Sequence, residues 1–352
     1  MTDKADRMEV LDAMRGVAAL LVVLFHVRQF VPLVASGYLA VDFFFVLSGL
    51  VIAQTYGHRL AGAMGFAEFA RVRIIRMYPL FLVGLILAIG RALGQLAMHV
   101  PDGLSATQLV LAVVFELFML PSPVDQRLFA LNEPGWSLFF ELLINLVYAA
   151  ALVKANVKAL VAFVVLAGLV LLVAAFSEGS LGTGFTWDAF HWGLARVSYS
   201  FAVGVLICRL NLHRRFRLGR GFFVIPLAAL TVVLVVSPPA PYTAFYDAGV
   251  VLLMSPLLVV LGASCTMTSG FRPMARLLGD TSYAIYATHY PLLFMVGFAM
   301  RKLDIAPALW LPGFLLLMIA LAALLNRFYD EPVRRWLLGV TRPRPTWATH
   351  AP

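Results

Sequence analysis

The chain has 352 residues, of which 62% are hydrophobic and only 13% are charged. Soluble globular proteins have about 45–50% apolar and about 25% charged residues. A soluble core of this size cannot bury so much apolar surface, so the composition excludes a soluble enzyme, a secreted disulfide scaffold and a disordered chain. The net charge of +9 then indicates basic residues collected on the cytoplasmic side of a membrane, and nucleic acid is not an expected partner.

Apolar runs of membrane-spanning length recur along the whole chain. A span needs about 20 mostly apolar residues. The candidates, in chain order, are 11–31, 38–57, 79–99, 105–120, 135–153, 157–176, 188–208, 221–237, 244–263, 279–300 and 306–326. The first run follows a charged start and lacks a small-residue cleavage site, so it is predicted to be a retained helix and not a signal peptide.

The distribution of lysine and arginine predicts the topology. Twenty of the 27 fall in six segments, and only four fall in the predicted outer loops. The six segments are 1–10, 58–78, 154–158, 208–220, 264–278 and the stretch after 326. All six segments can lie on the cytoplasmic side only if one candidate does not cross the membrane. The weakest candidate is 105–120, because it is short and contains Glu116 near its middle. We therefore predict an all-α polytopic membrane protein with ten spans, both termini cytoplasmic, and a non-spanning half-helix at 105–120.

We predict one integral-membrane domain over 1–352, with an ordered core over about 9–337 and a short basic cytoplasmic tail over 338–352. No internal repeat and no nucleotide-binding glycine motif occurs in the sequence. The two cysteines, Cys208 and Cys265, lack metal-ligand spacing, so no metal is expected.

The first span carries three ionisable residues, Asp12, Arg15 and His26. Such groups cost at least about 2.5–3.5 kcal/mol each inside a membrane and are functional candidates. Asp12 and Arg15 are spaced to pair on one helix face. Arg15 and His26 are eleven residues apart, which places them on one face about 16 Å apart. The alternative is that Arg15 reaches the membrane surface and His26 caps the outer end beside Arg28.

The second span contains Asp42 near its outer end and Ser48-Gly49 in its middle. Ser-Gly is as typical of close helix packing as of a substrate contact. Asp42 is expected either to pair with a cation or to lie at the water interface.

The segment RVRIIRMYP follows and is interpreted as a basic loop. It contains Arg71, Arg73 and Arg76, of which the last two share a helical face. Arginine clusters bind phosphate through bidentate hydrogen bonds. They also anchor proteins to anionic lipid headgroups, and both interpretations fit this segment.

The later spans add further polar side chains. NEPGWSLFFELL carries Trp136, Ser137 and Glu141, and a buried Glu141 would need a partner such as His26, or a proton. Additional polar residues, His191, Arg196, Ser282, Tyr286 and His289, occur in spans that we expect to enclose a polar interior. The last three lie at positions i, i+4 and i+7 of one helix, where substrate contact and inter-helix hydrogen bonding are both open.

Six elements of the sequence together resemble the membrane acyltransferase-3 family. In order, these elements are LDAMRGVAALLVVLFH, VDFFFVLSGLVI, RVRIIRMYP, PGWSLFFELL, GDTSYAIYATHYP and FYDEP. They extend from Leu11 to Pro332, nearly the whole chain. The element after Trp136 has one acidic residue where many members have two. The chain also ends without an extracytoplasmic hydrolase-like domain, so it resembles the stand-alone members.

The resemblance implies an O-acyltransferase that moves an acyl group, usually acetyl from acetyl-CoA, to a hydroxyl of a carbohydrate or related acceptor. Acyl-CoA would be a donor substrate, with no tightly bound cofactor. Arg71, Arg73, Arg76 and Arg15 are expected to hold the CoA phosphates. His26 is the expected general base.

Asp12 belongs to the same candidate catalytic set, beside Arg15. Glu141 or Asp42 is expected to orient His26, and an acyl-histidine intermediate stays open. The expected location is a bacterial cytoplasmic (inner) membrane, with lipid as a partner.

A transporter or flippase of a polar or lipid-linked solute is the alternative function, since buried charges also suit transport. Transporters often have inverted repeats, and the sequence shows none.

Overall fold

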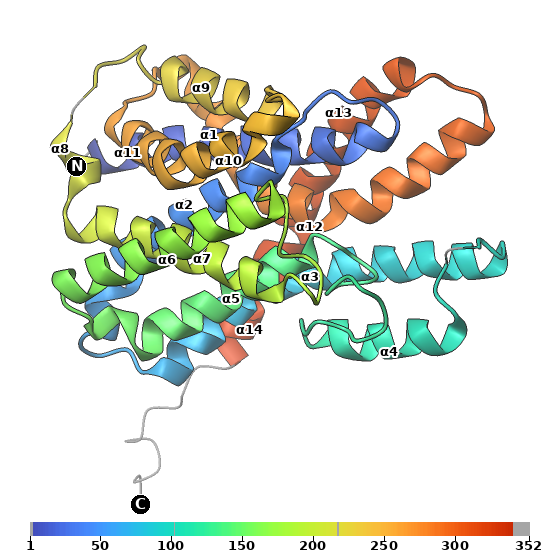
Figure 1. The fold of residues 1–352 in the computed structure, drawn as a ribbon, viewed down its shortest axis with the longest axis horizontal. Helices are drawn as coiled ribbons and strands as arrows, with labels where there is room; N and C mark the ends of the chain where they lie inside the picture. Colours follow the sequence, from blue (N-terminus) through green and yellow to red (C-terminus); the bar gives the residue numbers. More distant parts are fainter. Residues whose placement is uncertain (1–2, 102, 217, 341–352) are drawn as a thin grey trace, which may run out of the picture.

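The computed structural model describes residues 3–101, 103–216 and 218–340 (Figure 1). Within these residues every element is a helix, apart from two isolated bridges that join Arg127 to Thr186 and Leu218 to Cys265. Helices follow from the apolar runs, because a backbone in lipid must satisfy its hydrogen bonds internally. The fold class predicted from the sequence is therefore confirmed as all-α.

The α-helices are α1 Asp3–His26, α2 Ala40–Leu60, α3 Phe66–Ala97, α4 Ala106–Leu117, α5 Gly135–Ala150, α6 Val157–Glu178, α7 Phe190–Arg209, α8 Leu212–Arg215, α9 Val224–Val235, α10 Thr243–Gly249, α11 Ser255–Ser264, α12 Arg272–Lys302, α13 Pro307–Leu325 and α14 Glu331–Val340. Two π-helices interrupt this series, η5 Val250–Met254 and η7 Asn326–Asp330. The 3-10 turns are Val27–Gln29, Gly37–Leu39, Leu152–Lys154, Ala240–Tyr242 and Ser269–Phe271.

Six helical segments of the described residues are long and apolar enough to cross a membrane. They are Gly37–Leu60, Phe66–Ala97, Val157–Glu178, Phe190–Arg209, Ala240–Ser264 and Pro307–Val340. The protein is therefore a polytopic membrane protein. The count of ten spans stays a prediction, because the other four predicted spans differ from these six: α1 and α12 are long but carry many polar residues, and α5 and α9 are apolar but shorter. Several of those polar residues, among them Arg15, His26, Ser282 and His289, bond to one another between α1 and α12, as described below.

The segment predicted not to span forms α4, a helix of 12 residues. At 1.5 Å per residue it is about 18 Å long, shorter than a hydrocarbon core of about 30 Å. It packs beside α3 (Figure 1). Glu116 is fully buried and accepts a hydrogen bond from the Leu131 backbone N–H at 2.9 Å. This carboxylate therefore anchors the loop that precedes α5.

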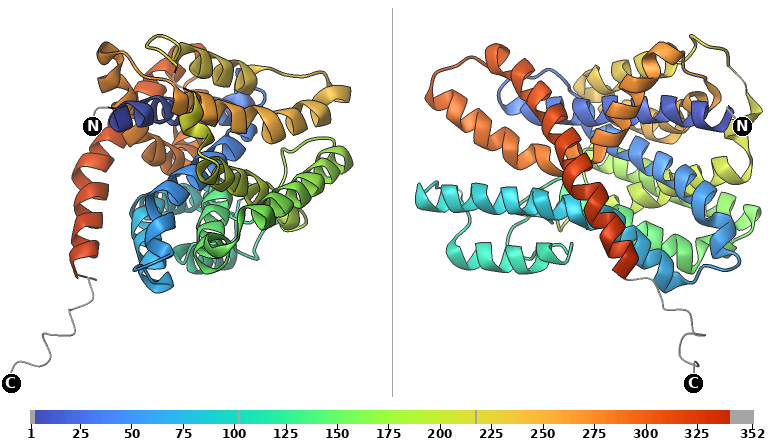
Figure 2. Two further views of the ribbon diagram at one scale, coloured as in Figure 1. Left: turned by 90° about the vertical axis from the view of Figure 1, so that its left-hand side faces the viewer. Right: turned by 180° about the vertical axis from the view of Figure 1, so that it is seen from behind.

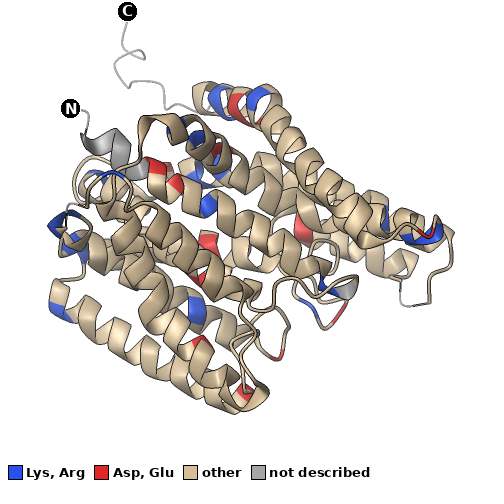
Figure 3. Ribbon diagram, turned by 90° about the horizontal axis from the view of Figure 1, so that it is seen from above, with Lys and Arg blue, Asp and Glu red and all other residues tan. Residues whose placement is uncertain are grey.

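Most segments predicted to be cytoplasmic lie at one end of the molecule, which we call the basic end. The start of α1, the turn between α2 and α3, the turn Leu152–Lys154 and α8 gather there, whereas the turn between α12 and α13 lies at the opposite end (Figure 1). Basic residues are coloured on the ribbon at the basic end, including α8, and a smaller basic group lies at the α12–α13 turn (Figure 3). Of the predicted tail, residues 341–352 lie outside the described residues, as does Arg217.

Two helix pairs that are distant in sequence form the centre of the fold. The first pair is α1 with α12, where Gly16 lies against the Leu278 backbone. The second is α2 with α7, where Gly49 lies against the Phe201 backbone and Gly204 against Val46. A side chain at these glycines would push the backbones apart, so close packing depends on them. Behind them, α13, η7 and α14 form one long rod that crosses the other helices obliquely (Figure 2).

The segment interpreted as a basic loop is helical. α3 begins at Phe66 and continues through Arg71, Arg73, Arg76 and Pro79. The loop interpretation was wrong because the apolar run alone marks the membrane-embedded part, whereas α3 extends several turns beyond it. As a result the arginines project from a rigid helix.

Candidate functional site

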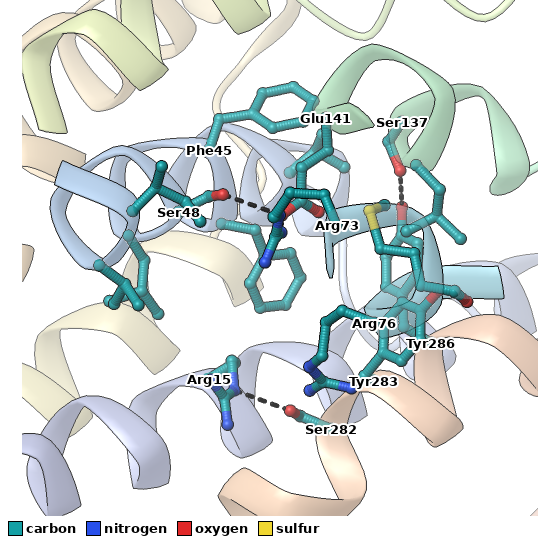
Figure 4. Close-up of a pocket in the computed structure, with 17 residues that line it drawn as sticks. Arg15, Phe45, Ser48, Arg73, Arg76, Ser137, Glu141, Ser282, Tyr283 and Tyr286 are labelled. Atoms are coloured by element: carbon teal, nitrogen blue, oxygen red, sulfur yellow. Dashed lines mark hydrogen bonds and ion pairs between the residues drawn. The ribbon is translucent and has the colours of Figure 1, made fainter. Parts of the chain in front are cut away.

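A cavity of about 190 Å³ lies where α1, α2, α3, α5 and α12 meet. Its polar lining is Arg15, Ser48, Arg73, Arg76, Ser137, Glu141, Ser282, Tyr283 and Tyr286 (Figure 4). Typical small-molecule sites measure about 300–1,000 Å³. The cavity therefore accommodates a narrow chain or a small group, and a whole nucleotide would have to remain outside it.

Arg15 joins α1 to α12 at the cavity wall. Its Nε donates to the Ser282 hydroxyl at 2.9 Å, and its Nη2 donates to the Gly279 carbonyl at 2.7 Å. Asp12 lies 3.1 Å from the same guanidinium, which confirms the predicted pairing three residues apart. The guanidinium is thus held from two sides while about a third of the side chain stays exposed.

Arg73 and Arg76 reach the cavity from α3, and Arg71 is not among its lining residues. Arg76 lies 3.6 Å from Asp330, which the π-helix η7 places in a fully buried position. Arg334 approaches the same carboxylate at 2.9 Å. Asp330 of the FYDEP element therefore pairs with Arg76 of the cavity. The sequence analysis did not predict this contact, because the two residues are far apart in the sequence.

Glu141 and Ser48 form the opposite wall. The Ser48 hydroxyl donates to Glu141 Oε1 at 2.8 Å, and Arg73 Nη2 lies 3.4 Å from the same oxygen. The expectation that Glu141 orients His26 is therefore wrong, because both partners of this carboxylate lie in the cavity. Of the Ser48-Gly49 pair, the serine lines the cavity and the glycine provides close helix packing.

Asp42 and Arg196 form a sealed ion pair away from the cavity. Arg196 Nη2 lies 2.6 Å from Asp42 Oδ2, and the two side chains are 1% and 0% exposed. Arg196 also donates to the carbonyls of Thr183 and Tyr38, and its guanidinium lies over the ring of buried Trp136. Asp42 therefore has a cation as its partner and does not orient His26.

The partner of His26 is His289. His26 Nδ1 lies 3.2 Å from His289 Nε2 and 2.9 Å from the Val22 carbonyl. His289 is fully buried, whereas His26 is half-buried. Arg15 and His26 both face α12, where they contact Ser282 and His289. This agrees with the prediction that the two residues share one face of α1.

The cavity stops short of the histidine pair. Tyr286 lines the cavity and shares a 2.6 Å hydrogen bond with Ser137. The Tyr286 ring centroid lies 5.8 Å from that of His289, whereas His26 is not among the lining residues. All three residues of the predicted α12 stripe thus make inter-helix contacts, and two of them also line the cavity.

One candidate lies elsewhere, and one group of residues was missed by the sequence analysis. His191 is exposed at the start of α7 beside Trp192, so its assignment to the polar interior is wrong.

The missed group is Tyr290 with Glu133. Tyr290 lies edge-on to His26, and its hydroxyl donates to Glu133 at 3.2 Å. Burial raises the pKa of this loop carboxyl, and Arg127 partly offsets that shift. Glu133 is the acidic residue of the NEPGW element, and it is the sequence feature that could have indicated this contact with Tyr290.

These features define an integral membrane protein with an arginine-lined cavity and a histidine pair on two adjacent central helices. The model of the acyltransferase-3 family, described as an acyltransferase domain, matches residues 8–327. The chain therefore belongs to this family and is a membrane acyltransferase.

A curated relative is named "Protein 2 in picA locus" of Rhizobium radiobacter. It is 38% identical over 184 residues, which are 48% of this chain and 95% of the relative. No solved structure matches this chain.

Proposed function

We propose that the protein transfers an acyl group, acetyl in the simplest case, from acyl-CoA to a hydroxyl of a carbohydrate acceptor. The observation that carries this proposal is the arrangement along α1 and α12. Arg15 lies in a cavity with two further arginines, and His26 lies three turns along the same helix face. This arrangement suits a long anionic thioester at one end and a proton acceptor at the other.

The cavity arginines suit the anionic part of the donor. Arg15, Arg73 and Arg76 line the cavity together with the Glu141 carboxylate, whereas Asp12 and Asp330, the carboxylates that pair with Arg15 and Arg76, are not lining residues. Phosphate groups are costly to remove from water unless guanidinium groups replace their hydration. We assign the phosphates to the guanidinium groups of Arg15, Arg73 and Arg76, with the nucleotide outside the cavity, and the pantetheine arm to the cavity itself, whose size fits a narrow chain.

In the proposed reaction the acceptor oxygen attacks the thioester carbonyl carbon. The new C–O bond forms and the C–S bond breaks, so the acyl group moves to the acceptor. His26 takes the hydroxyl proton and returns it to the departing thiolate of CoA. A general base contributes about 10²–10⁴-fold to such a step. Because Tyr286 and the histidine pair adjoin, the thioester belongs at the Tyr286 end of the cavity.

The test uses the full chain purified in detergent, with acetyl-CoA and a panel of glycans that carry free hydroxyls. We expect release of free CoA and one added acetyl group on the glycan by mass spectrometry. His26→Ala should lower kcat by at least about 10²-fold with the KM for acetyl-CoA unchanged. His191→Ala is the matched control, because this histidine is exposed and lies outside the site.

Two outcomes would overturn the proposal. Folded protein that moves a glycan or lipid-linked solute across vesicles without releasing CoA would support the transporter alternative. Wild-type turnover by His26→Ala would remove His26 from the proton transfer.

A further inference from the structure

The hydrogen bonds of the histidine pair determine which ring nitrogens carry protons. Nδ1 of His289 lies 2.8 Å from the Tyr286 carbonyl and 3.1 Å from the Ile285 carbonyl. Carbonyl oxygens only accept hydrogen bonds, so this Nδ1 must be an N–H donor. In the neutral ring, His289 Nε2 is then left with a lone pair directed toward His26.

The same reasoning extends to His26. Its Nδ1 faces two acceptors, the Val22 carbonyl at 2.9 Å and the His289 Nε2 lone pair at 3.2 Å. His26 Nδ1 must therefore be the N–H, and the lone pair of the neutral ring lies on Nε2. Within the described residues this Nε2 makes no hydrogen bond, and it is not sealed from solvent. It is the atom that can accept a proton.

We propose that His289 is a positioning residue that fixes the tautomer and orientation of His26 so that Nε2 is the basic atom. This inference rests on the proposed role of His26 as general base. In many hydrolases a buried carboxylate performs this task. Here the two carboxylates that sequence reasoning considered are occupied elsewhere, Asp42 by Arg196 and Glu141 by Ser48 and Arg73.

The position of His289 suits this function. It is fully buried on α12, and its ring is held by two backbone carbonyls of its own helix. Its Nε2 therefore has little freedom to turn away from His26. The ring of Tyr290 contacts His26 edge-on at 5.3 Å between centroids and restricts rotation of that imidazole further.

The decisive experiment compares His289→Phe with His289→Gln in the purified full chain. Phenylalanine keeps a planar ring but offers no acceptor to His26 Nδ1–H, whereas the glutamine side-chain oxygen can replace Nε2 as acceptor. We expect His289→Phe to lower kcat about 10²-fold with the KM for acetyl-CoA unchanged, because the Val22 carbonyl alone leaves the imidazole free to change its orientation, and the loss of a positioned base lies within the range of general-base catalysis. His289→Gln should recover activity to within about tenfold of the native chain.

A matched control is Thr288→Val. Thr288 is the neighbouring fully buried polar residue of α12, and among the described residues its hydroxyl donates to the Ala284 carbonyl of its own helix alone. Thr288→Val should keep native kcat and KM. The melting temperature in detergent verifies that each variant folds. His289→Leu is a second variant without a hydrogen-bond acceptor, for use if phenylalanine disturbs the packing.

The double variant His26→Ala/His289→Phe separates positioning from general structural damage. If His289 acts through His26, the double variant is no slower than His26→Ala alone. Additive losses, native kcat in folded His289→Phe, or failure of His289→Gln to recover activity would each overturn the inference. Native activity of His26→Ala would instead overturn the proposed function, so the two failures are distinguishable.

Discussion

Two arginine–carboxylate pairs of this protein, Asp42–Arg196 and Glu141–Arg73, have the same chemistry but differ in their access to solvent and to the cavity. Asp42 and Arg196 join α2 to α7 and are at most 1% exposed, with the remaining guanidinium donors directed to backbone carbonyls. Arg73 and Glu141 join α3 to α5 beside the cavity, and their side chains are 12% and 23% exposed. A sealed pair whose hydrogen bonds go to each other and to the backbone holds helices together, whereas a pair beside a cavity can also bond to a ligand.

The largest effect that follows from this comparison is on stability. Arg196→Ala leaves Asp42 charged, fully buried and without its cation, which costs about 3–5 kcal/mol in the free energy of unfolding. We expect a large drop in melting temperature in detergent. Arg196→Lys keeps the charge but loses the forked geometry, so its drop should be intermediate. A folded Arg196→Ala with native melting temperature and no activity would assign the sealed pair to function instead.

The second effect is on donor binding at the cavity. Arg73→Ala removes a charge-assisted contact of about 1.5–3 kcal/mol, so we expect the KM for acetyl-CoA to rise by roughly 10–150-fold. The melting temperature should change much less than in Arg196→Ala. Arg59→Ala is the control, since this exposed arginine lies at the same end of the molecule but outside the cavity. An unchanged KM in Arg73→Ala would contradict the donor assignment.

The smallest effect is the response to salt. Ions screen charges that solvent can reach and have little effect on sealed pairs. Raising sodium chloride from about 0.05 to about 0.5 M shortens the Debye length from about 14 Å to about 4 Å, which should raise the KM for acetyl-CoA several-fold in the native chain. The increase should be smaller in Arg73→Ala. The melting temperature should change little over the same range of salt. A marked fall would contradict the distinction between sealed and accessible pairs.

The sequence by itself determined the membrane class, the helical fold and one face of the first helix. Composition requires lipid contact, and an eleven-residue spacing must bring Arg15 and His26 onto one face, because the helical period is fixed by backbone geometry. The pairing of Asp12 with Arg15 is equally local.

Only the tertiary structure decided which distant side chains meet. Periodicity places a residue on a face but carries no information about the helix opposite, so Glu141 was assigned to His26 although it pairs with Ser48 and Arg73. The histidine pair unites residues 263 positions apart in the sequence. The proton positions on both rings depend on that contact, because each nitrogen takes its donor or acceptor role from the atom it faces.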